Sequence, residues 1–134
     1  MTTVLVDTNV LVDVFTEDCE WSDWSASTLV EASRNGQLAI NPIIYAEVSV
    51  GFDRIEDVDD VLPSDYFIRT PLPWEAAFLA AKAFERYRTQ GGIRTTPLPD
   101  FFIGAHATVA GMTLLTRDAR RYRTHFPRLK IIAP

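Results

Sequence analysis

Residues 3–9 carry the pattern that decides the fold: Thr3-Val4-Leu5-Val6-Asp7-Thr8-Asn9. Four consecutive β-branched or aliphatic residues are typical of a parallel strand that is buried on both faces. The run ends at Asp7, and residues 10–15 continue with a helical pattern. A strand that leads directly into a helix is the repeating unit of an α/β domain.

Short aliphatic runs and helical patterns keep alternating along the chain. Further strands are predicted at residues 38–40, 66–68, 113–116 and 130–132. Helices are predicted at residues 25–35, 43–54, 74–90 and 100–110, with a loop at residues 92–99. Because strands separated by helices usually pair in parallel, we predict one α/β domain over residues 1–134 with a mainly parallel sheet of four or five strands.

Length and composition limit the class of protein. A chain of 134 residues has room for one domain with an ordinary hydrophobic core. Its single cysteine, Cys19, excludes an intramolecular disulfide framework and a cysteine-rich zinc site. No apolar run approaches the roughly 20 residues of a membrane span, and the first residues do not have the pattern of a signal peptide. We therefore expect a cytoplasmic domain with no membrane partner.

The net charge of −5 conceals a strong asymmetry between the two halves of the chain. Residues 1–67 hold 14 Asp and Glu against two Arg, a net charge of −12. Residues 68–134 hold four Asp and Glu against 11 Lys and Arg, a net charge of +7. A uniformly acidic surface would repel a polyanion, but a polarised chain leaves room for both a cation site and an anion-binding surface.

Four carboxylates are predicted to lie close to strand ends. Asp7 directly follows the first strand, and Asp118 comes two residues after the fourth. Glu47 lies on the helix that follows the second strand, and Asp100 lies at the start of a later helix. Ligands of open α/β sheets bind outside the carboxyl ends of the strands, so we expect the four side chains to converge there.

Converging carboxylates favour a particular chemistry. Like charges within about 5 Å of one another either raise their pKa values or need a cation between them. A donor set made only of oxygens suits Mg²⁺ or Mn²⁺, which can activate water and polarise a phosphoryl oxygen. Singly, Asp7 and Asp100 are also compatible with helix caps, Glu47 with a surface residue and Asp118 with a turn. Their joint placement favours metal-assisted phosphoester hydrolysis.

Four blocks of the sequence match a known family in order and spacing. They are Val6-Asp7-Thr8-Asn9-Val10-Leu11, Ile44-Tyr45-Ala46-Glu47, Pro99-Asp100-Phe101-Phe102-Ile103-Gly104-Ala105-His106-Ala107 and Leu115-Thr116-Arg117-Asp118. The chain resembles the PIN-domain ribonucleases, most specifically the VapC-type toxins of bacterial toxin–antitoxin modules. The resemblance extends through the closing segment, residues 121–132.

The resemblance implies an α/β/α sandwich and an endoribonuclease that hydrolyses RNA with a water activated by Mg²⁺ or Mn²⁺. It also implies a type II toxin that forms a homodimer and is inhibited by a cognate antitoxin. The four acidic positions of the family, both catalytic and metal-binding, match Asp7, Glu47, Asp100 and Asp118. Its two polar supporting positions match Asn9 and Thr116. His106 is less common in this family's helix motif, and its role stays open.

Two other classes of α/β protein with acidic sites do not fit the residues after the first strand. A phospho-acceptor receiver domain needs adjacent acids after the first strand, and a haloacid-dehalogenase-like phosphatase needs Asp-x-Asp there; Asp7-Thr8-Asn9 supplies neither. A catalytically silent PIN-like module that binds RNA is the alternative that stays open. It explains poorly why all four acids are present.

Several surface features have two interpretations each. Basic side chains beside the fourth strand either contact RNA phosphates or form a solvated face; the candidates for RNA contact are Arg117, Arg120 and Arg121. An apolar stripe that includes Trp74 and Phe78 is expected to be mostly core, with part of it available to a dimer interface. Trp21 and Trp24 either pack simply or line a groove for the antitoxin. The acidic stretch, residues 53–65, is expected to be a solvated face.

Overall fold

The computed structural model describes residues 2–91 and 97–134. The strands are β1 (Thr2–Val6), β2 (Gly36–Ile40), β3 (Phe67–Arg69), β4 (Thr113–Leu115) and β5 (Ile131–Ile132). The helices are α1 (Thr8–Phe15), α2 (Ser22–Asn35), α3 (Pro42–Ser49), α4 (Ile55–Val61), α5 (Trp74–Thr89), α6 (Leu98–Ala110) and α7 (Ala119–Arg123). Most of the predicted elements are present, with ends that differ by a few residues.

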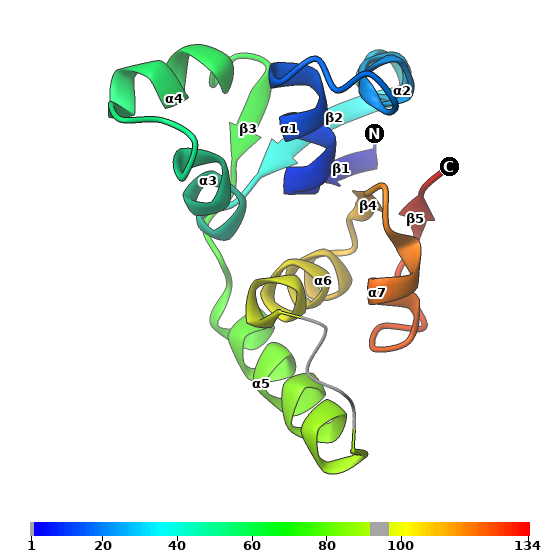
Figure 1. The fold of residues 1–134 in the computed structure, drawn as a ribbon. Coiled ribbons are helices and arrows are strands. Elements are labelled where there is room, and N and C mark those ends of the chain that lie inside the picture. Colours follow the sequence, from blue (N-terminus) through cyan, green and yellow to red (C-terminus); the bar gives the residue numbers. More distant parts are fainter. Residues whose placement is uncertain (1, 92–96) are drawn as a thin grey trace.

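The five strands form one parallel sheet in the order β3-β2-β1-β4-β5. Leu5 in the central strand pairs with Ala39 of β2 on one side and with Leu114 of β4 on the other. Helices α1 to α4 lie on one face of the sheet and α5 to α7 on the other (Figure 1). The predicted α/β domain is thus confirmed as a helix–sheet–helix sandwich.

The strand order reverses direction at β1. The chain passes from β1 outward to β2 and β3, and then returns across the sheet to β4 and β5. The helices that follow β1 and β4 therefore leave on opposite faces, and in open α/β sheets such a switch point is where the ligand-binding crevice lies. Asp7 and Thr116 are the first residues beyond β1 and β4, so both start at this crevice.

Two glycines allow close packing at points where a side chain would collide. A Cβ at Gly36 would overlap the backbone carbonyl of Thr2, with which Gly36 pairs across β1 and β2. A Cβ at Gly104 in α6 would overlap the ring of Phe126 and come within 3.1 Å of the ring of Tyr122. Gly104 therefore lets the segment around α7 lie directly against α6.

The predicted C-terminal end of the helix at residues 43–54 was wrong, because α3 ends at Ser49. The acidic stretch then contains a helix of its own, α4, which the sequence analysis did not predict. Its apolar positions are spaced for one helical face, and Val58 and Leu62 are buried in the core. The acids between them obscured this spacing, although they do lie on the outward face as expected.

The apolar stripe on α5 was wrongly assigned to the core. Trp74 is 89% exposed and Phe78 is 67% exposed. The buried face of α5 consists instead of Ala76, Ala80 and Ala83, which face α6. Small residues let two helices approach closely, so the alanines form the contact and the large side chains lie outside it.

The remaining differences from the predicted elements concern the start of α6 and one additional short helix. α6 begins at Leu98, two residues before the predicted start, so Asp100 is a residue of its first turn and not its cap. Most of the loop predicted at residues 92–99 lies outside the described residues. The short helix α7 was not predicted. Within residues 2–91 and 97–134, no helix is long and apolar enough to cross a membrane.

Candidate metal and nuclease site

Asp7 lies at the centre of the crevice and is held from three sides. Its Oδ1 accepts a hydrogen bond from the backbone N–H of Thr8 at 2.8 Å, so Asp7 also serves as the N-cap of α1. Its Oδ2 accepts from the hydroxyls of Thr116 at 2.7 Å and Tyr122 at 2.9 Å. The cap and the site interpretations of Asp7 are therefore compatible, because one carboxylate fills both positions.

Thr116 uses its whole hydrogen-bonding capacity within the protein. Its hydroxyl donates to Asp7 and accepts from the Asn9 side-chain amide at 3.3 Å and from the Asp118 N–H at 3.1 Å. A hydroxyl has one donor and two acceptor positions, and all three are taken. Asn9 also accepts from the N–H of Arg117 at 3.2 Å. Thr116 and Asn9 thus fix the segment that carries Asp118 against the start of α1.

Glu47 approaches the same crevice from α3. Its Oε1 accepts a hydrogen bond from the hydroxyl of Thr8 at 2.6 Å, and the side chain is half-buried. Pro42 at the first position and Asn41 as the N-cap start this helix directly after β2. The surface interpretation of Glu47 is not supported, because its carboxylate points toward residues that follow β1.

Asp100 and Asp118 are joined by one guanidinium. Arg121 Nη1 lies 3.2 Å from Asp100 Oδ2, and its Nε lies 2.8 Å from Asp118 Oδ2. The Asp100 side chain is 7% exposed, whereas those of Asp118 and Arg121 are 41% and 46% exposed. Arg121 therefore lies at the open side of the site, with Asp100 beneath it.

Burial raises the pKa values of three carboxyl groups here, and repulsion adds to the effect in two of them. Burial and the nearby charges of Asp7 and Glu47 raise the pKa of Asp100 to about 6, against the opposing effect of Arg121. Burial raises the pKa of Asp7, although hydrogen bonds from Thr116 and Tyr122 counteract it. Burial also raises the pKa of Glu47, and the charge of Asp7 adds to the effect. The three groups are therefore close enough to influence one another.

Tyr122 is a site residue that the sequence analysis missed. It is fully buried, and its hydroxyl contacts Asp7 at 2.9 Å and Asp100 Oδ1 at 3.5 Å. Burial and the two carboxylates raise its pKa well above the ordinary value, so the hydroxyl stays protonated and donates. The sequence signal was indirect: Gly104 in the middle of an otherwise apolar helix leaves space for this ring.

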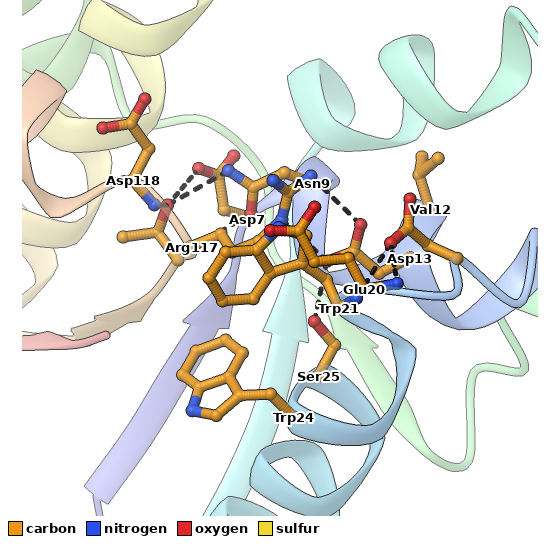
Figure 2. Close-up of polar contacts among 12 residues, drawn as sticks. Asp7, Asn9, Val12, Asp13, Glu20, Trp21, Trp24, Ser25, Arg117 and Asp118 are labelled. Atoms are coloured by element: carbon orange, nitrogen blue, oxygen red, sulfur yellow. Dashed lines mark hydrogen bonds and ion pairs between the residues drawn. The ribbon is translucent and has the colours of Figure 1, made fainter. Parts of the chain in front are cut away.

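Arg117 lies between Asp118 and Asn9 in the sequence-distant segments that meet here, and its guanidinium pairs with Asp13 (Figure 2). Its Nε and Nη2 bind Asp13 Oδ2 and Oδ1 at 2.8 and 3.0 Å. Asp13 is buried and also accepts from the hydroxyl of Ser25 at 2.8 Å. The guanidinium lies 5.3 Å from the ring centroid of Trp21, which in turn meets Trp24 edge to face. This contact network joins α1 and α2 to the segment between β4 and α7.

His106 is buried in α6 and holds the start of α3. Its Nδ1 lies 3.0 Å from the side-chain amide of Asn41, whose oxygen accepts from the N–H of Ile44. The amide nitrogen therefore donates to His106, and burial lowers the pKa of the imidazole. His106 is thus a neutral hydrogen-bonded core residue that positions the helix carrying Glu47, and not a candidate metal ligand.

The donor set of the crevice fits a hard divalent cation. The groups are carboxylates from four segments of the chain, and oxygen-only donor sets suit such ions. Burial raises the pKa values of three of them, Asp7, Glu47 and Asp100. Within the described residues, no group of three His, Cys, Asp or Glu side chains is already arranged to hold a metal ion. Arg121, Thr116 and Tyr122 supply the contacts to these carboxylates instead.

Comparison with models of known protein families identifies the family of this chain. The PIN domain model matches residues 4–127, which is nearly the whole chain. The protein therefore belongs to the PIN domain family. Comparison with curated protein sequences finds no match.

Solved structures share the fold at low sequence identity. A chain of VapBC2 from Rickettsia felis, in a structure with a DNA fragment from its promoter, has a TM-score of 0.77 and 19% identity, with 99% of both chains covered. A chain of FitAcB from Neisseria gonorrhoeae has a TM-score of 0.69 and 17% identity, with 96% of both covered. A toxin–antitoxin complex from Klebsiella pneumoniae has a TM-score of 0.66 and 23% identity, covering 96% of this chain and 95% of the other.

Proposed function

We propose that this PIN-domain protein is a metal-dependent endoribonuclease and the toxin of a type II toxin–antitoxin pair. The observation that carries the proposal is the convergence of Asp7, Glu47 and Asp100 from three segments of the chain. Burial raises the pKa of each, and the charge of Asp7 adds to the effect at Glu47 and Asp100. Asp118 joins them through the guanidinium of Arg121. Buried carboxylates that repel one another destabilise a fold, so a catalytic use explains their presence better than a structural one.

The four carboxylates would hold Mg²⁺ or Mn²⁺, with Thr116 and Asn9 keeping Asp7 and Asp118 in orientation. An ion held by these residues would supply Lewis-acid chemistry, by polarising a phosphoryl oxygen and lowering the pKa of a water molecule. Glu47, which Thr8 holds at one oxygen, accepts the proton of the attacking water. Water adds to phosphorus, the P–O3′ bond breaks, and the 3′-oxygen takes up a proton from solvent water, while Glu47 returns its proton to solvent. The products carry a 5′-phosphate and a 3′-hydroxyl.

The RNA would lie along the basic side of the site. Arg120 is exposed on α7, and Arg121 lies at the mouth of the crevice. Both are candidates for contacts to phosphates, which arginine binds through paired hydrogen bonds. Arg117 is a weaker candidate than the sequence suggested, because Asp13 already occupies its guanidinium.

The proposed partners are a cognate antitoxin and a second copy of the chain. Several structures that share the fold are toxin–antitoxin complexes, which supports an antitoxin for this protein. The exposed rings of Trp74 and Phe78 on α5 favour this helix as the dimer surface, since large apolar side chains at a surface often mark an interface. Light scattering of the wild-type protein and of a Trp74→Ser, Phe78→Ser variant tests the dimer.

RNA cleavage by the purified protein tests the activity. Structured RNAs are incubated with Mg²⁺, with Mn²⁺ or with EDTA, and the ends of the products are mapped. We expect cleavage only with metal, and its loss in Asp7→Asn and Asp100→Asn. Cleavage that persists in both variants would show a contaminating nuclease.

The second candidate is a PIN-like module that binds RNA without cutting it. It is favoured by one observation: in the described residues the acids are not already arranged as a metal cluster. RNA binding without cleavage, in both metals and on every RNA tested, would support this alternative.

A further inference from the structure

Arg121 occupies the position where a metal ligated by Asp100 and Asp118 would need space. Its guanidinium bridges the two carboxylates, with Nη1 3.2 Å from Asp100 Oδ2 and Nε 2.8 Å from Asp118 Oδ2. Its charge also lowers the pKa values of Asp7 and Glu47 against the effect of burial. In the described part of the chain, it is the one cation whose field reaches all three buried or half-buried acids.

Such a guanidinium and a divalent ion compete for the same oxygens. Two cations a few ångström apart repel strongly in a partly buried site. The second oxygen of Asp100 faces the hydroxyl of Tyr122 at 3.5 Å, so protein donors contact both oxygens of this carboxylate. A metal ion that binds Asp100 and Asp118 therefore has to replace the Arg121 contacts.

The position of Arg121 makes this replacement easy. Its side chain is 46% exposed and lies on the short helix α7, so the guanidinium can rotate into solvent without disturbing the core. Its ion pair with Asp118 is exposed on both sides, at 46% and 41%, and such pairs contribute little to stability. Arg117 differs from Arg121 in two ways: its own side chain is less exposed, at 31%, and its partner Asp13 lies outside the four-carboxylate group and is also bonded to Ser25.

We propose that Arg121 is a resident counter-cation of the carboxylate group: it holds Asp100 and Asp118 before metal binds, and the metal ion displaces it. The displaced guanidinium is then free for the phosphate contact proposed above. This inference rests on the proposed function, because it takes the four carboxylates as the metal site. Arg121 is a positioning residue in this scheme, and its effect is opposite in sign to that of a metal ligand.

Calorimetric titration with Mn²⁺ alone tests the competition. Arg121→Gln removes the bridging cation, and Arg123→Gln is the matched control that removes the same charge from an exposed position on α7. We expect Arg121→Gln to bind Mn²⁺ at least about five-fold more tightly than wild type, and Arg123→Gln to change affinity by less than about two-fold. Unchanged or weaker binding in Arg121→Gln overturns the proposal, as does the absence of Mn²⁺ binding in all three proteins.

Nuclear magnetic resonance of the wild-type protein tests the displacement without any substitution. The Nε atoms of Arg121 and Arg117 each lie 2.8 Å from a carboxylate oxygen, so their N–H signals report on two ion pairs in one sample. On titration with Mg²⁺ we expect the Arg121 signal to move with metal occupancy and the Arg117 signal to stay. An Arg121 signal that stays while the site saturates overturns the proposal.

These measurements separate the inference from the nuclease assignment. Tighter Mn²⁺ binding in Arg121→Gln supports the counter-cation role of Arg121 even if no RNA is cleaved. In that case the protein would be the RNA-binding module and not the nuclease. Metal-dependent cleavage by the wild-type protein, together with an unchanged Mn²⁺ affinity in Arg121→Gln, supports the nuclease function and contradicts the counter-cation role of Arg121.

Discussion

The hydroxyl of Tyr122 donates to Asp7 Oδ2 across 2.9 Å and so joins two residues that are 115 positions apart in the sequence. Both side chains are buried, so water does not supply this hydrogen bond. Together with Thr116, the tyrosine fixes one oxygen of Asp7 toward the protein interior. The orientation of the central carboxylate is therefore set from α7 as well as from the sheet.

Tyr122→Phe should weaken the site without emptying the core. The ring stays in its place against Gly104, while Asp7 loses one of its hydrogen bonds. We expect the free energy of unfolding to fall by about 1–2 kcal/mol. We expect Mn²⁺ affinity and metal-dependent RNA cleavage to fall by up to about tenfold, because 1.4 kcal/mol corresponds to a factor of ten. Calorimetry, chemical denaturation and initial cleavage rates measure the three effects.

Tyr45→Phe is the control for this substitution. Its hydroxyl donates to Asp59 at 2.7 Å on the acidic side of the molecule, outside the crevice. We expect it to leave metal affinity and cleavage unchanged. Equal losses of metal affinity in the two variants would contradict a specific role for Tyr122.

Thr116 offers a test of hydroxyl orientation against side-chain shape. Its hydroxyl serves Asp7, Asn9 and Asp118 at once. Thr116→Val keeps the shape but leaves these groups without their partner, at a cost of about 2–3 kcal/mol in a buried position. Thr116→Ser keeps the hydroxyl and should retain most of the metal affinity. Thermal denaturation and Mn²⁺ titration of both variants test whether Thr116→Ser retains more stability and metal affinity than Thr116→Val. If Thr116 served only in packing, Thr116→Val would retain more.

The sequence was sufficient for the parts of the fold that depend on local pattern. An uninterrupted aliphatic run such as Val4 to Val6 predicts a central parallel strand, and the structure buries all three residues. Helix α4 was missed because acidic residues separate its buried residue Val58 from the buried C-cap residue Leu62. The stripe with Trp74 and Phe78 was misplaced because helical spacing identifies a face but not its partner.

The site could be predicted where a residue lies close to a predicted strand end or helix start. Asp7 and Asp118 are found in that way, since parallel strands bring their carboxyl ends together. Tyr122 could not be found, because its contact with Asp7 depends on how α7 packs against α6 at Gly104. The different environments of Arg117 and Arg121 were equally hidden, since both belong to one basic run whose partners come from distant segments.

Arg117 should matter for stability more than its neighbours do. Arg117→Gln leaves the buried carboxylate of Asp13 with only Ser25 as a side-chain partner. Removing one partner of a buried ion pair is strongly destabilising, and we expect a loss of about 2–4 kcal/mol. Arg120→Gln removes the same charge at an exposed position and should change stability by less than about 0.5 kcal/mol. Urea denaturation of both variants tests this, and equal stabilities would contradict a bracing role for Arg117.

Asp100 should lower the stability of the metal-free protein at neutral pH. Its pKa in the folded protein is about 6, above the ordinary value of 3.8, so the folded state binds this proton more tightly than the unfolded state does. The contribution of Asp100 to the free energy of unfolding therefore decreases as the pH rises from about 4 to about 6, and the loss is complete at pH 7.

Asp100→Asn removes this titration together with the candidate metal ligand. In EDTA at pH 7 we expect the variant to be more stable than wild type by about 1–2 kcal/mol, with the advantage vanishing near pH 4. With Mn²⁺ the difference in stability between the variant and wild type should decrease or change sign, because a bound metal stabilises only the protein that retains the carboxylate. Thermal melts at both pH values, with EDTA and with Mn²⁺, measure the difference. A variant that is less stable than wild type in EDTA at pH 7 would show that the Asp100 carboxylate stabilises the fold through Arg121, and is not held there at a cost.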